Sequence, residues 1–558
     1  MAAIHPLHHP ALILLVFGAS IGQPKQLYGQ QVAWVKHYGN PSPQIAGFKL
    51  ACDGSGNIYG TGSIAAGGLI DFDGNSAPVQ GQVDIIVAKW DSTGVNQWVR
   101  TVGGVPVLED WDEGEYINYN PATEQLIVNG TYNSLADFGC VEFTEQNDQR
   151  AIFMACYTPE GACEWARTIR GGYVYSRSLL IDANSDLYWF GASVLSSPQF
   201  VGFPGVNIPY GGFVARYGVD GILKSARRIL NIGGVSSAKW VDTTHWLMSI
   251  PALEGSELFG VDLGITESAS GVLAMVDTSG TVVWHQTYQG SEGFGNGSAG
   301  CAVVGSHAIV VGLFRGEMTF DGETLTSPED DSRVFLASYD LWSGEPEWIR
   351  PFVTEGHVAS SQDLQVDEQG TIYFFGEYSD TLTVGPMQAL PVGESSSFLA
   401  RFDTLGNCLS AFYFGPSSGS SGSIALSRNR IVLSAPYAGN VSFGPVTLPS
   451  SNSIVLAKLD TLTGYTGVGP SFMALQENLL IYANPNNGLC SVQLPTHLQF
   501  TNGLLLSIFD QTGQLVQRVP VTMGNAGVQV DIQAQAKGLY HVELGDGRQR
   551  YTGTIVFE

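Results

Sequence analysis

The side chains that could carry chemistry are spread thinly along this sequence. Outside the first thirty residues every histidine stands alone, without the His-Glu-x-x-His spacing of a zinc hydrolase. There is also no phosphate-binding loop and no Gly-x-Gly-x-x-Gly segment that opens a helix. We therefore predict no catalytic, cofactor-binding or metal-binding set, and we expect these histidines to be core or surface residues: His37, His245, His285, His307, His357, His497 and His541.

Two other segments match or approach the sequence patterns of functional motifs. Gly415-Pro416-Ser417-Ser418-Gly419 matches the Gly-x-Ser-x-Gly pattern of a nucleophile elbow, but that motif needs a sharp turn from a strand into a helix. The surrounding Ser-Gly pairs favour a flexible loop. Acidic runs at 109–113 and 329–331 could hold calcium, but neither has the alternating acidic spacing of a calcium loop, so we expect solvated surface.

Seven cysteines cannot all pair within one chain. Cys156 and Cys163 would face each other across a hairpin in the common register, so they are the predicted disulfide in an oxidising compartment. No Cys-x-x-Cys spacing occurs, which argues against structural zinc. We expect the other five cysteines to be small buried apolar residues.

A repeated hairpin supplies the elements that must position any site. Each copy is a short apolar strand, usually an acidic turn that ends in glycine, and then often tryptophan. Successive turn glycines stand 58 to 67 residues apart, which indicates a repeat architecture. They are Gly94, Gly161, Gly221, Gly280, Gly344, Gly406 and Gly464.

A second pair of short strands lies about thirty residues upstream of each hairpin, as in 50–53 and 57–62. Four antiparallel strands are the content of one β-propeller blade, and seven units fall within the usual range for a closed ring. The segment Trp34–Gly39 resembles a fourth strand without its first three, so we predict that it completes the last blade and removes free sheet edges. Some loops must be long, above all the stretch between Gly62 and Asp84, and its counterparts are Phe320-Asp321-Gly322 and Phe443-Gly444.

Tryptophan recurs in the fourth strand of five units. We expect these side chains to pack between blades, the alternative being a ligand cage. They are Trp34, Trp98, Trp165, Trp284 and Trp348.

Charge and the N-terminal segment indicate the compartment. The net charge is −26, and such a surface repels nucleic acid and anionic membranes. Residues 11–21 form an apolar run that is too short to span a bilayer, so we predict a signal peptide at 1–29 and no transmembrane segment.

The pattern changes after Gly469-Pro470, where short alternating strands predict a small β-sandwich at 475–558. Its landmarks are Tyr482, Asn484 and Pro485 in one turn, Asp510 and Gly513 in a hairpin, and Gly538 with Tyr540 before a last strand. In this order they resemble the type A C-terminal sorting domain of type IX secretion cargo in Bacteroidetes. That resemblance implies the type IX secretion machinery as a partner and a final location that is secreted or at the cell surface.

The repeat region, residues 31–470, resembles the secreted bacterial seven-bladed β-propeller repeat through Asp53–Tyr59 and the hairpin from Asp84 to Trp98. The predicted fold class is therefore all-β, a seven-bladed β-propeller followed by a β-sandwich. Propellers host many activities, so the fold alone gives no function.

Our leading hypothesis is a non-catalytic binding or adhesion scaffold with a glycan or protein ligand and no cofactor. The alternative is a lyase or glycoside hydrolase with carboxylates in the central funnel. A third hypothesis is a spacer that only carries the sorting domain.

Overall fold

The computed structural model describes most of the chain. The described residues are 32–38, 44–65, 68–104, 112–133, 135–145, 150–266, 270–288, 290–291, 297–327, 332–354, 360–384, 387–389, 391, 393–417, 422–427, 430–443, 446–460, 479–494, 505–510, 515–521, 527–545 and 550–558. Over these ranges the chain forms strands and no helix, which confirms the all-β prediction. Accordingly, the described segments include no helix long and apolar enough to span a membrane. The predicted signal peptide lies outside them.

Seven antiparallel sheets built on four strands follow one another within residues 32–460 of the described chain. Sheet 1 contains β2 (Gln44–Cys52), β3 (Ile58–Ala65), β6 (Val83–Trp90) and β7 (Asn96–Val102). Sheet 2 contains β8 (Glu113–Asn120), β9 (Gln125–Asn133), β12 (Arg150–Tyr157) and β13 (Cys163–Arg170). Sheet 3 contains β14 (Tyr173–Ile181), β15 (Leu187–Val194), β17 (Gly211–Tyr217) and β18 (Leu223–Leu230). Sheet 4 contains β19 (Ser237–Trp240), β20 (His245–Ala252), β23 (Ser270–Asp277) and β24 (Val282–Tyr288).

The remaining three sheets repeat the scheme. Sheet 5 contains β25 (Gly297–Val304), β26 (His307–Arg315), β29 (Ser332–Asp340) and β30 (Pro346–Pro351). Sheet 6 contains β32 (Ser360–Val366), β33 (Ile372–Tyr378), β36 (Ser396–Phe402) and β37 (Cys408–Phe414). Sheet 7 contains β38 (Ser423–Ser427), β39 (Arg430–Phe443), β40 (Val446–Asp460) and the N-terminal strand β1 (Val32–Tyr38).

Extra short strands lie in the connection between the second and third strands of sheets 1 to 6. They are β4 (Gly68–Phe72), β5 (Asn75–Val79), β10 (Leu135–Asp137), β11 (Glu142–Thr144), β16 (Gln199–Phe200), β21 (Glu257–Leu258), β22 (Val261–Asp262), β27 (Glu317–Phe320), β28 (Glu323–Thr326), β34 (Leu382–Val384) and β35 (Met387–Ala389); β31 (Val353–Thr354), which follows sheet 5, pairs with β34. The hairpins β4–β5 and β27–β28 occupy two of the three stretches predicted to be extended; in the third, Phe443 ends β39 and Gly444 lies outside the described residues.

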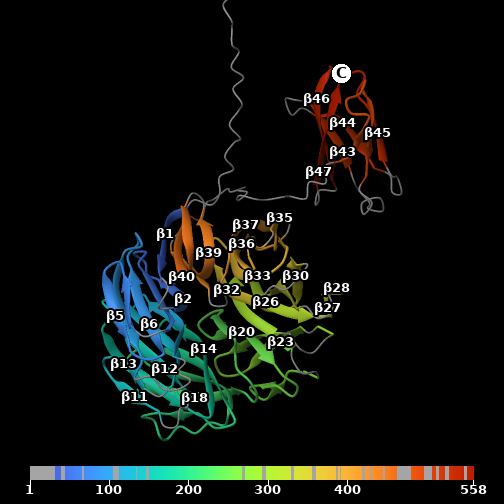
Figure 1. Ribbon diagram of the computed structural model, residues 1–558. Coiled ribbons are helices and arrows are strands. Elements are labelled where there is room, and N and C mark those ends of the chain that lie inside the picture. The colour runs from blue at the N-terminus through green and yellow to red at the C-terminus, as the bar shows by residue number, and fades with distance from the viewer. Residues whose placement is uncertain are drawn as a thin grey trace, which may run out of the picture.

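The first strands of the seven sheets contact one another in chain order, and β38 of the last sheet also contacts β2 of the first. The N-terminal strand pairs antiparallel with β40, Lys36 lying opposite Leu456. Figure 1 shows the two ends of this region side by side, with blue β1 next to orange β40. The prediction that the N-terminal strand completes the last four-stranded sheet is confirmed.

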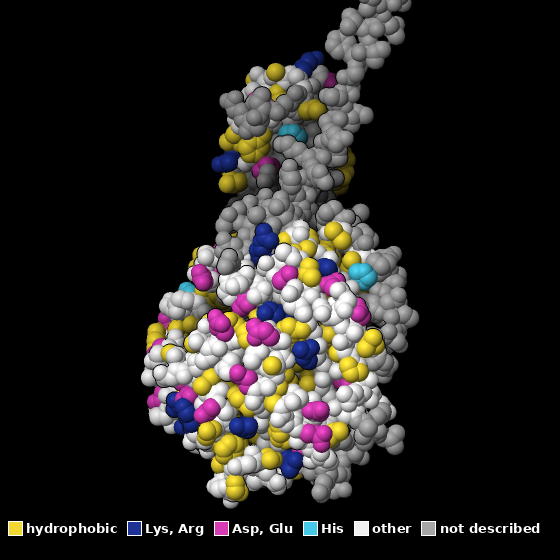
Figure 2. Space-filling view, turned by 90° about the vertical axis from the view of Figure 1, so that its left-hand side faces the viewer, with side chains coloured by type: hydrophobic (Ala, Val, Ile, Leu, Met, Phe, Trp, Pro, Cys, Tyr) yellow, Lys and Arg dark blue, Asp and Glu magenta, His cyan; other side chains and the backbone are white. Residues whose placement is uncertain are grey.

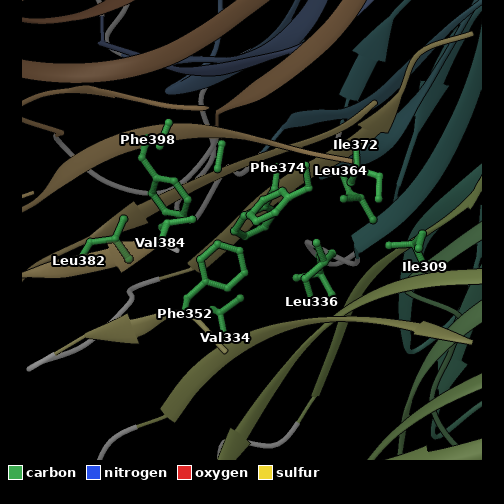
Figure 3. Close-up of a cluster of buried hydrophobic side chains, with 14 of the residues drawn as sticks. Ile309, Val334, Leu336, Phe352, Leu364, Ile372, Phe374, Leu382, Val384 and Phe398 are labelled. Carbon is green, nitrogen blue, oxygen red and sulfur yellow. The ribbon is translucent and has the colours of Figure 1, made fainter. Parts of the chain in front are cut away.

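Apolar side chains fill the space between neighbouring sheets. Sheets 5 and 6 share one such cluster, in which the ring of Phe352 lies 5.0 Å from that of Phe374 and 6.0 Å from that of Phe398 (Figure 3). Leu336 of sheet 5 and Ile372 of sheet 6 are fully buried in the same cluster. Each sheet therefore buries its apolar faces against its neighbours, as expected of stacked repeats.

The repeated tryptophans pack between sheets, as predicted. Each indole N–H donates to a backbone carbonyl in the third-to-fourth-strand turn of the next sheet, at 2.9 to 3.2 Å, for Trp34, Trp98, Trp165, Trp284 and Trp348. The ring lies against the turn glycine, where an added Cβ would sit 2.6 to 2.8 Å from the nearest ring atom. These glycines also have positive φ, 82° at Gly161, so both the close approach of the ring and the backbone conformation favour glycine at this position.

Successive strands of sheets 1 to 7 run in opposite directions, so the turns and connections between them lie on two distinct faces. The turns between first and second and between third and fourth strands lie on one, which we call the turn face. The second-to-third-strand connections and the beginnings of the first strands lie on the other, which we call the mouth face. Pairing of Glu113, at the start of β8, with Thr131, near the end of β9, illustrates this arrangement.

The C-terminal part contains two antiparallel sheets that share one apolar core. One contains β41 (Ile481–Tyr482), β42 (Leu489–Gln493) and β45 (Gly527–Asp531); the other contains β43 (Leu505–Phe509), β44 (Leu515–Pro520), β46 (Gly538–Gly545) and β47 (Arg550–Phe557). Fully buried Val492, Ile508 and Val542 belong to this core.

Candidate functional site

The first strands of the seven sheets line a central cavity of ≈ 550 Å³. Its wall is built from all seven strands β2, β8, β14, β19, β25, β32 and β38. Serine, aliphatic side chains and backbone groups make up much of this wall, and its larger polar side chains are Lys49, Tyr116, Tyr119, Lys239, Asp363 and Gln365.

Some of these polar groups are committed to the fold. Oδ1 of Asp363 accepts the N–H of Leu364 at 2.8 Å, and Oδ2 accepts the N–H of Ile424 in the next sheet at 3.0 Å. Nζ of Lys49 donates to the carbonyl of Gly422 at 3.3 Å. Asp363 and Lys49 therefore link neighbouring sheets.

β-Bulges reshape the first strands where they begin on the mouth face. In β8 the register shifts between Gly114 and Tyr116, which leaves Glu115 unpaired. In β14 it shifts between Ser176 and Ser178, which leaves Arg177 unpaired. Bulges redirect a side chain and are frequent beside functional sites. Two adjacent sheets thus direct an acid and a base to the same mouth.

The carboxylate of Glu115 sits in a partly buried, charged setting. Thr131 donates its hydroxyl to Glu115 Oε1 at 3.4 Å, and Arg150 donates from Nη2 to the same hydroxyl at 3.0 Å. Burial, reinforced by repulsion from Glu113, raises the pKa of Glu115 to about 7, although Arg150 and Arg177 oppose this rise. The group can therefore exchange a proton near neutral pH.

Aromatic rings complete this arrangement. The ring of Tyr175 has the guanidinium of Arg150 5.7 Å from its centroid and that of Arg177 at 5.3 Å. Nε of Arg150 is buried with no hydrogen-bond partner among the described residues. Burial also raises the pKa of Tyr116, beside Glu115, to about 12, so its hydroxyl stays protonated and can donate. We call Glu115, Tyr116, Arg150, Tyr175 and Arg177 the mouth cluster.

Chemically, the mouth cluster can bind a polar ligand through guanidinium and hydroxyl donors and can pack sugar or aromatic rings on tyrosine. A single titrating carboxylate could also act as a general acid. No sequence pattern indicates this set, because Glu115 and Arg177 are 62 positions apart and meet through the bulges of neighbouring strands.

The histidines expected to be core or surface residues do not come together. Within the described chain no group of three or more His, Cys, Asp or Glu could hold a metal ion. His307 lies 2.6 Å from a carboxylate oxygen of Glu347 and His245 lies 3.0 Å from one of Asp242, while His37 and His541 are exposed. His357 and His497 lie outside the described residues.

Ser417, in the segment that matches the nucleophile-elbow pattern, is buried. Its hydroxyl donates to Glu377, and its N–H donates to the carbonyl of Ser395 at 2.9 Å. This serine is held in place, so the flexible-loop prediction is wrong for it. Residues 418–421 are outside the described part.

The acidic run at 109–113 also departs from the prediction of solvated surface. Asp112 is fully buried, and its Oδ1 accepts the N–H of Asn133 at 2.8 Å. The carboxylate holds the end of β9, a structural task that no spacing rule reveals. Residues 109–111 and 329–331 are not described.

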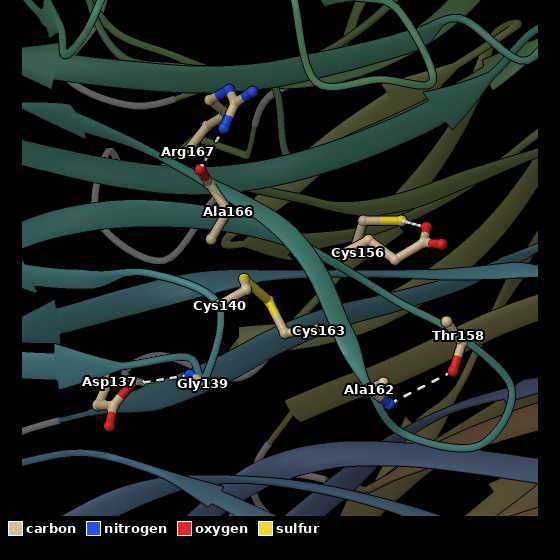
Figure 4. Close-up of a disulfide and its surroundings, with 10 residues drawn as sticks. Asp137, Gly139, Cys140, Cys156, Thr158, Ala162, Cys163, Ala166 and Arg167 are labelled. Carbon is tan, nitrogen blue, oxygen red and sulfur yellow. Dashed lines mark hydrogen bonds between the residues drawn. A yellow bond between two sulfur atoms is a disulfide. The ribbon is translucent and has the colours of Figure 1, made fainter.

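The predicted disulfide between Cys156 and Cys163 is wrong. Cys163 is bonded to Cys140, whose Cα lies 5.4 Å away, and Cys156 is a buried free thiol (Figure 4). The cause is a register shift after Cys156, which pairs that residue with Trp165 and places Tyr157 opposite Cys163. Cys156 therefore packs in the core shared with sheet 3, while Cys163 packs on the opposite side of its sheet. Burial raises the pKa of the Cys156 thiol well above its ordinary value, with Glu164 adding to the rise.

The proposed sorting residues lie in the C-terminal sheets. Tyr482 is 58% exposed, while Asn484 binds the last strand, donating to the carbonyl of Thr554 and accepting the N–H of Val556, both at 2.7 Å. Pro485 follows in the same turn, and Asp510 follows β43 directly. Gly538 opens β46, and Tyr540 is buried and donates its hydroxyl to the carbonyl of Ala536. Gly513 is not described.

The surface charge is dispersed on the side of the molecule that Figure 2 displays. Acidic side chains are scattered there among basic and apolar ones and do not gather in one patch. On this side of the molecule the acidic side chains therefore do not mark a site.

Residues 480–558 match a family model described as a secretion system C-terminal sorting domain. This type IX sorting domain indicates that the protein is exported to the cell surface or secreted. No curated protein matches the sequence significantly.

Similar solved structures are distant. A Bacteroides caccae protein of unknown function is 10% identical, with 63% of this chain and 93% of that chain covered and a TM-score of 0.29. Drosophila semaphorin 2a is 7% identical, with 96% and 99% covered and a TM-score of 0.39. An apocarotenoid oxygenase of Synechocystis is 11% identical, with 79% and 95% covered and a TM-score of 0.33. These TM-scores are too low to assign a shared fold.

Proposed function

We propose that this protein is a non-catalytic binding scaffold that works outside the cell. In this proposal residues 1–29 are a signal peptide, 31–470 are a seven-bladed β-propeller, and 475–558 are a β-sandwich that engages the type IX secretion machinery. The working surface is the mouth face, and the ligand is a glycan or a protein.

Support for the propeller comes from the repeat and from the contacts between sheets. Seven four-stranded sheets share apolar interfaces, their first strands contact one another in order, and β1 joins β40. Trp98 and its equivalents bind the next sheet in the same way each time. A ring explains all three features, since it leaves no first or last sheet without a neighbour.

One observation carries the binding role. The bulges of β8 and β14 bring Glu115 and Arg177 to one mouth, beside Arg150 and Tyr175. Extended connections surround that mouth in sheets 1 to 6 and enlarge the surface available to a partner. The same register shift occurs in β2, β25 and β32, so the bulge belongs to the repeat, and sheets 2 and 3 differ in the charged residues that it places.

A matched pair of surface substitutions tests which face works. Leu195, on the mouth face, is 76% exposed, and Leu405, on the turn face, is 62% exposed. The full chain would be screened against polysaccharides and extracellular proteins, and its best ligands remeasured with Leu195→Glu and Leu405→Glu. We expect Leu195→Glu alone to weaken binding; loss with Leu405→Glu alone, or no ligand in the panel, would contradict the proposal.

A second candidate is a carbohydrate-active enzyme, because the pKa of about 7 at Glu115 suits a general acid. Glu113, two residues away on the same strand, is the neighbouring carboxylate. This candidate predicts that the full chain depolymerises a polysaccharide and that Glu115→Gln abolishes turnover while binding remains. Binding without turnover by the unaltered protein excludes it for that ligand.

A further inference from the structure

Exposed apolar side chains gather beside the mouth cluster on sheet 3. Tyr173 is 56% exposed and pairs across the strands with Val194, which is 40% exposed. Tyr210, 54% exposed, directly precedes Gly211, which pairs with Ser193 next to Val194. Exposed apolar groups that cluster in this way mark a binding surface more often than scattered ones do.

This exposed row continues into the mouth cluster. Tyr173 and Tyr175 are two residues apart on β14, before its bulge, so their side chains share one face about 7 Å apart. Tyr175 in turn contacts Arg150 and Arg177. A ligand lying on Tyr173 can therefore place a substituent at the two guanidinium groups.

The local charge is unusual for this protein. Arg150 and Arg177 form no ion pair with any described residue, although the chain has twice as many acidic as basic residues, 51 against 25. The nearby Glu115 carries only part of its charge at neutral pH because its pKa is raised. The guanidinium of exposed Arg177 suits a carboxylate, which it can bind through paired N–H groups, and the charge of Arg150 beside it adds to the attraction.

The overall charge also limits the ligand. A net charge of −26 repels a long polyanion, whereas one carboxylate close to the arginines is within a Debye length of about 8 Å of them. Tyrosine faces suit the C–H surface of a sugar ring, and the hydroxyl ends can bond sugar hydroxyls. Aromatic rings and arginine side by side thus favour a mostly neutral saccharide with an isolated acid group.

We propose that the surface formed by Tyr173, Tyr175, Arg150 and Arg177 binds a saccharide bearing a single carboxylate, with a sugar ring on Tyr173 and the carboxylate at the two arginines. This proposal rests on the proposed binding function and names its ligand class. It needs no cofactor and no chemical step.

The test compares matched ligands on the full chain. Neutral oligosaccharides and the same oligosaccharides carrying one uronate or sialate would be titrated by calorimetry. We expect at least one acidic member to bind about tenfold or more tightly than its neutral counterpart, and Arg177→Ala to remove that preference. Arg177 is exposed, so the substitution leaves folding intact. Exposed Arg228, on the outer strand of sheet 3, supplies the control, because Arg228→Ala removes the same charge at a distance.

Tyr173→Ala separates stacking from charge recognition. It should weaken both members of a pair while leaving their ratio unchanged. Equal binding of acidic and neutral members, or an equal effect of Arg177→Ala and Arg228→Ala, overturns the ligand class but leaves the mouth-face scaffold standing if Leu195→Glu still weakens binding. If no saccharide binds and a protein ligand is lost with Leu405→Glu alone, both proposals fail.

Discussion

Replacing Gly161 by alanine should weaken the ring through a single contact. Gly161 has a φ of 82°, and an added Cβ would lie 2.8 Å from Cδ2 and 2.9 Å from Cε2 of Trp98. Left-handed backbone costs alanine about 1–2 kcal/mol, and forcing a methyl group into a packed site costs about 1–3 kcal/mol more. The indole cannot retreat freely, since its N–H is bonded to the carbonyl of Pro159 at 2.9 Å. We therefore expect Gly161→Ala to lower the free energy of unfolding by about 2–5 kcal/mol.

Gly202 provides a matched control for this substitution. Its φ is 87°, but no atom lies within 4 Å of an added Cβ. Gly202→Ala should therefore cost only the backbone term of about 1–2 kcal/mol. Both variants of the full chain would be unfolded in urea, and the midpoints and slopes compared. Adding Trp98→Phe to Gly161→Ala should recover part of the loss, because the smaller ring makes room. Equal losses at Gly161 and Gly202 would refute the account of the tryptophan contact.

Three further predictions concern other parts of the molecule. Cys163→Ser breaks the disulfide between Cys140 and Cys163, which are 23 positions apart, and should lower the free energy of unfolding by about 3 kcal/mol. Peptide mapping of the oxidised protein should recover a peptide in which Cys140 is linked to Cys163. A peptide that joins Cys156 to Cys163 would contradict the structure. The pKa of Glu115 is about 7 in the folded state and near 4.5 in the unfolded state, so between these two pH values the folded state holds an extra proton. The free energy of unfolding should therefore fall by about 2 kcal/mol as pH rises from 4.5 to 7, and Glu115→Gln should abolish this decline. The same decline in both proteins would argue against the raised pKa. Residues 478–558 should carry a fused reporter out of a secretion-competent host, and a reporter retained in the periplasm would disprove this.

Periodic residues made the repeat readable. Each of these turns in the described part of the chain has glycine at positive φ, and each tryptophan that packs on a turn needs that glycine, so the pair of Trp98 and Gly161 recurs in the sequence as it does in space. The terminal strand could be assigned because Trp34 stands in a fourth-strand pattern with no partners before it. Local spacing records such local constraints.

The candidate site could not be predicted from the sequence, because it depends on strand register and not on local spacing. Whether Glu115 or its neighbour turns toward the mouth depends on a bulge, and a shift of one residue moves a side chain to the other face. The same sensitivity misled the disulfide prediction, since one register shift after Cys156 separates it from Cys163. Cys140 lies in the connection that contains β10 and β11, outside the hairpin of Cys163. The spacing of cysteines within one hairpin therefore could not reveal this disulfide.

The most direct test of the account is an experimental structure of the full chain with the tightest ligand from the binding panel. We expect ligand density on the mouth face, over the starts of β8 and β14, in contact with Arg177 and Tyr173. Density on the turn face, around residues such as Leu405, with the mouth cluster left empty, would contradict it.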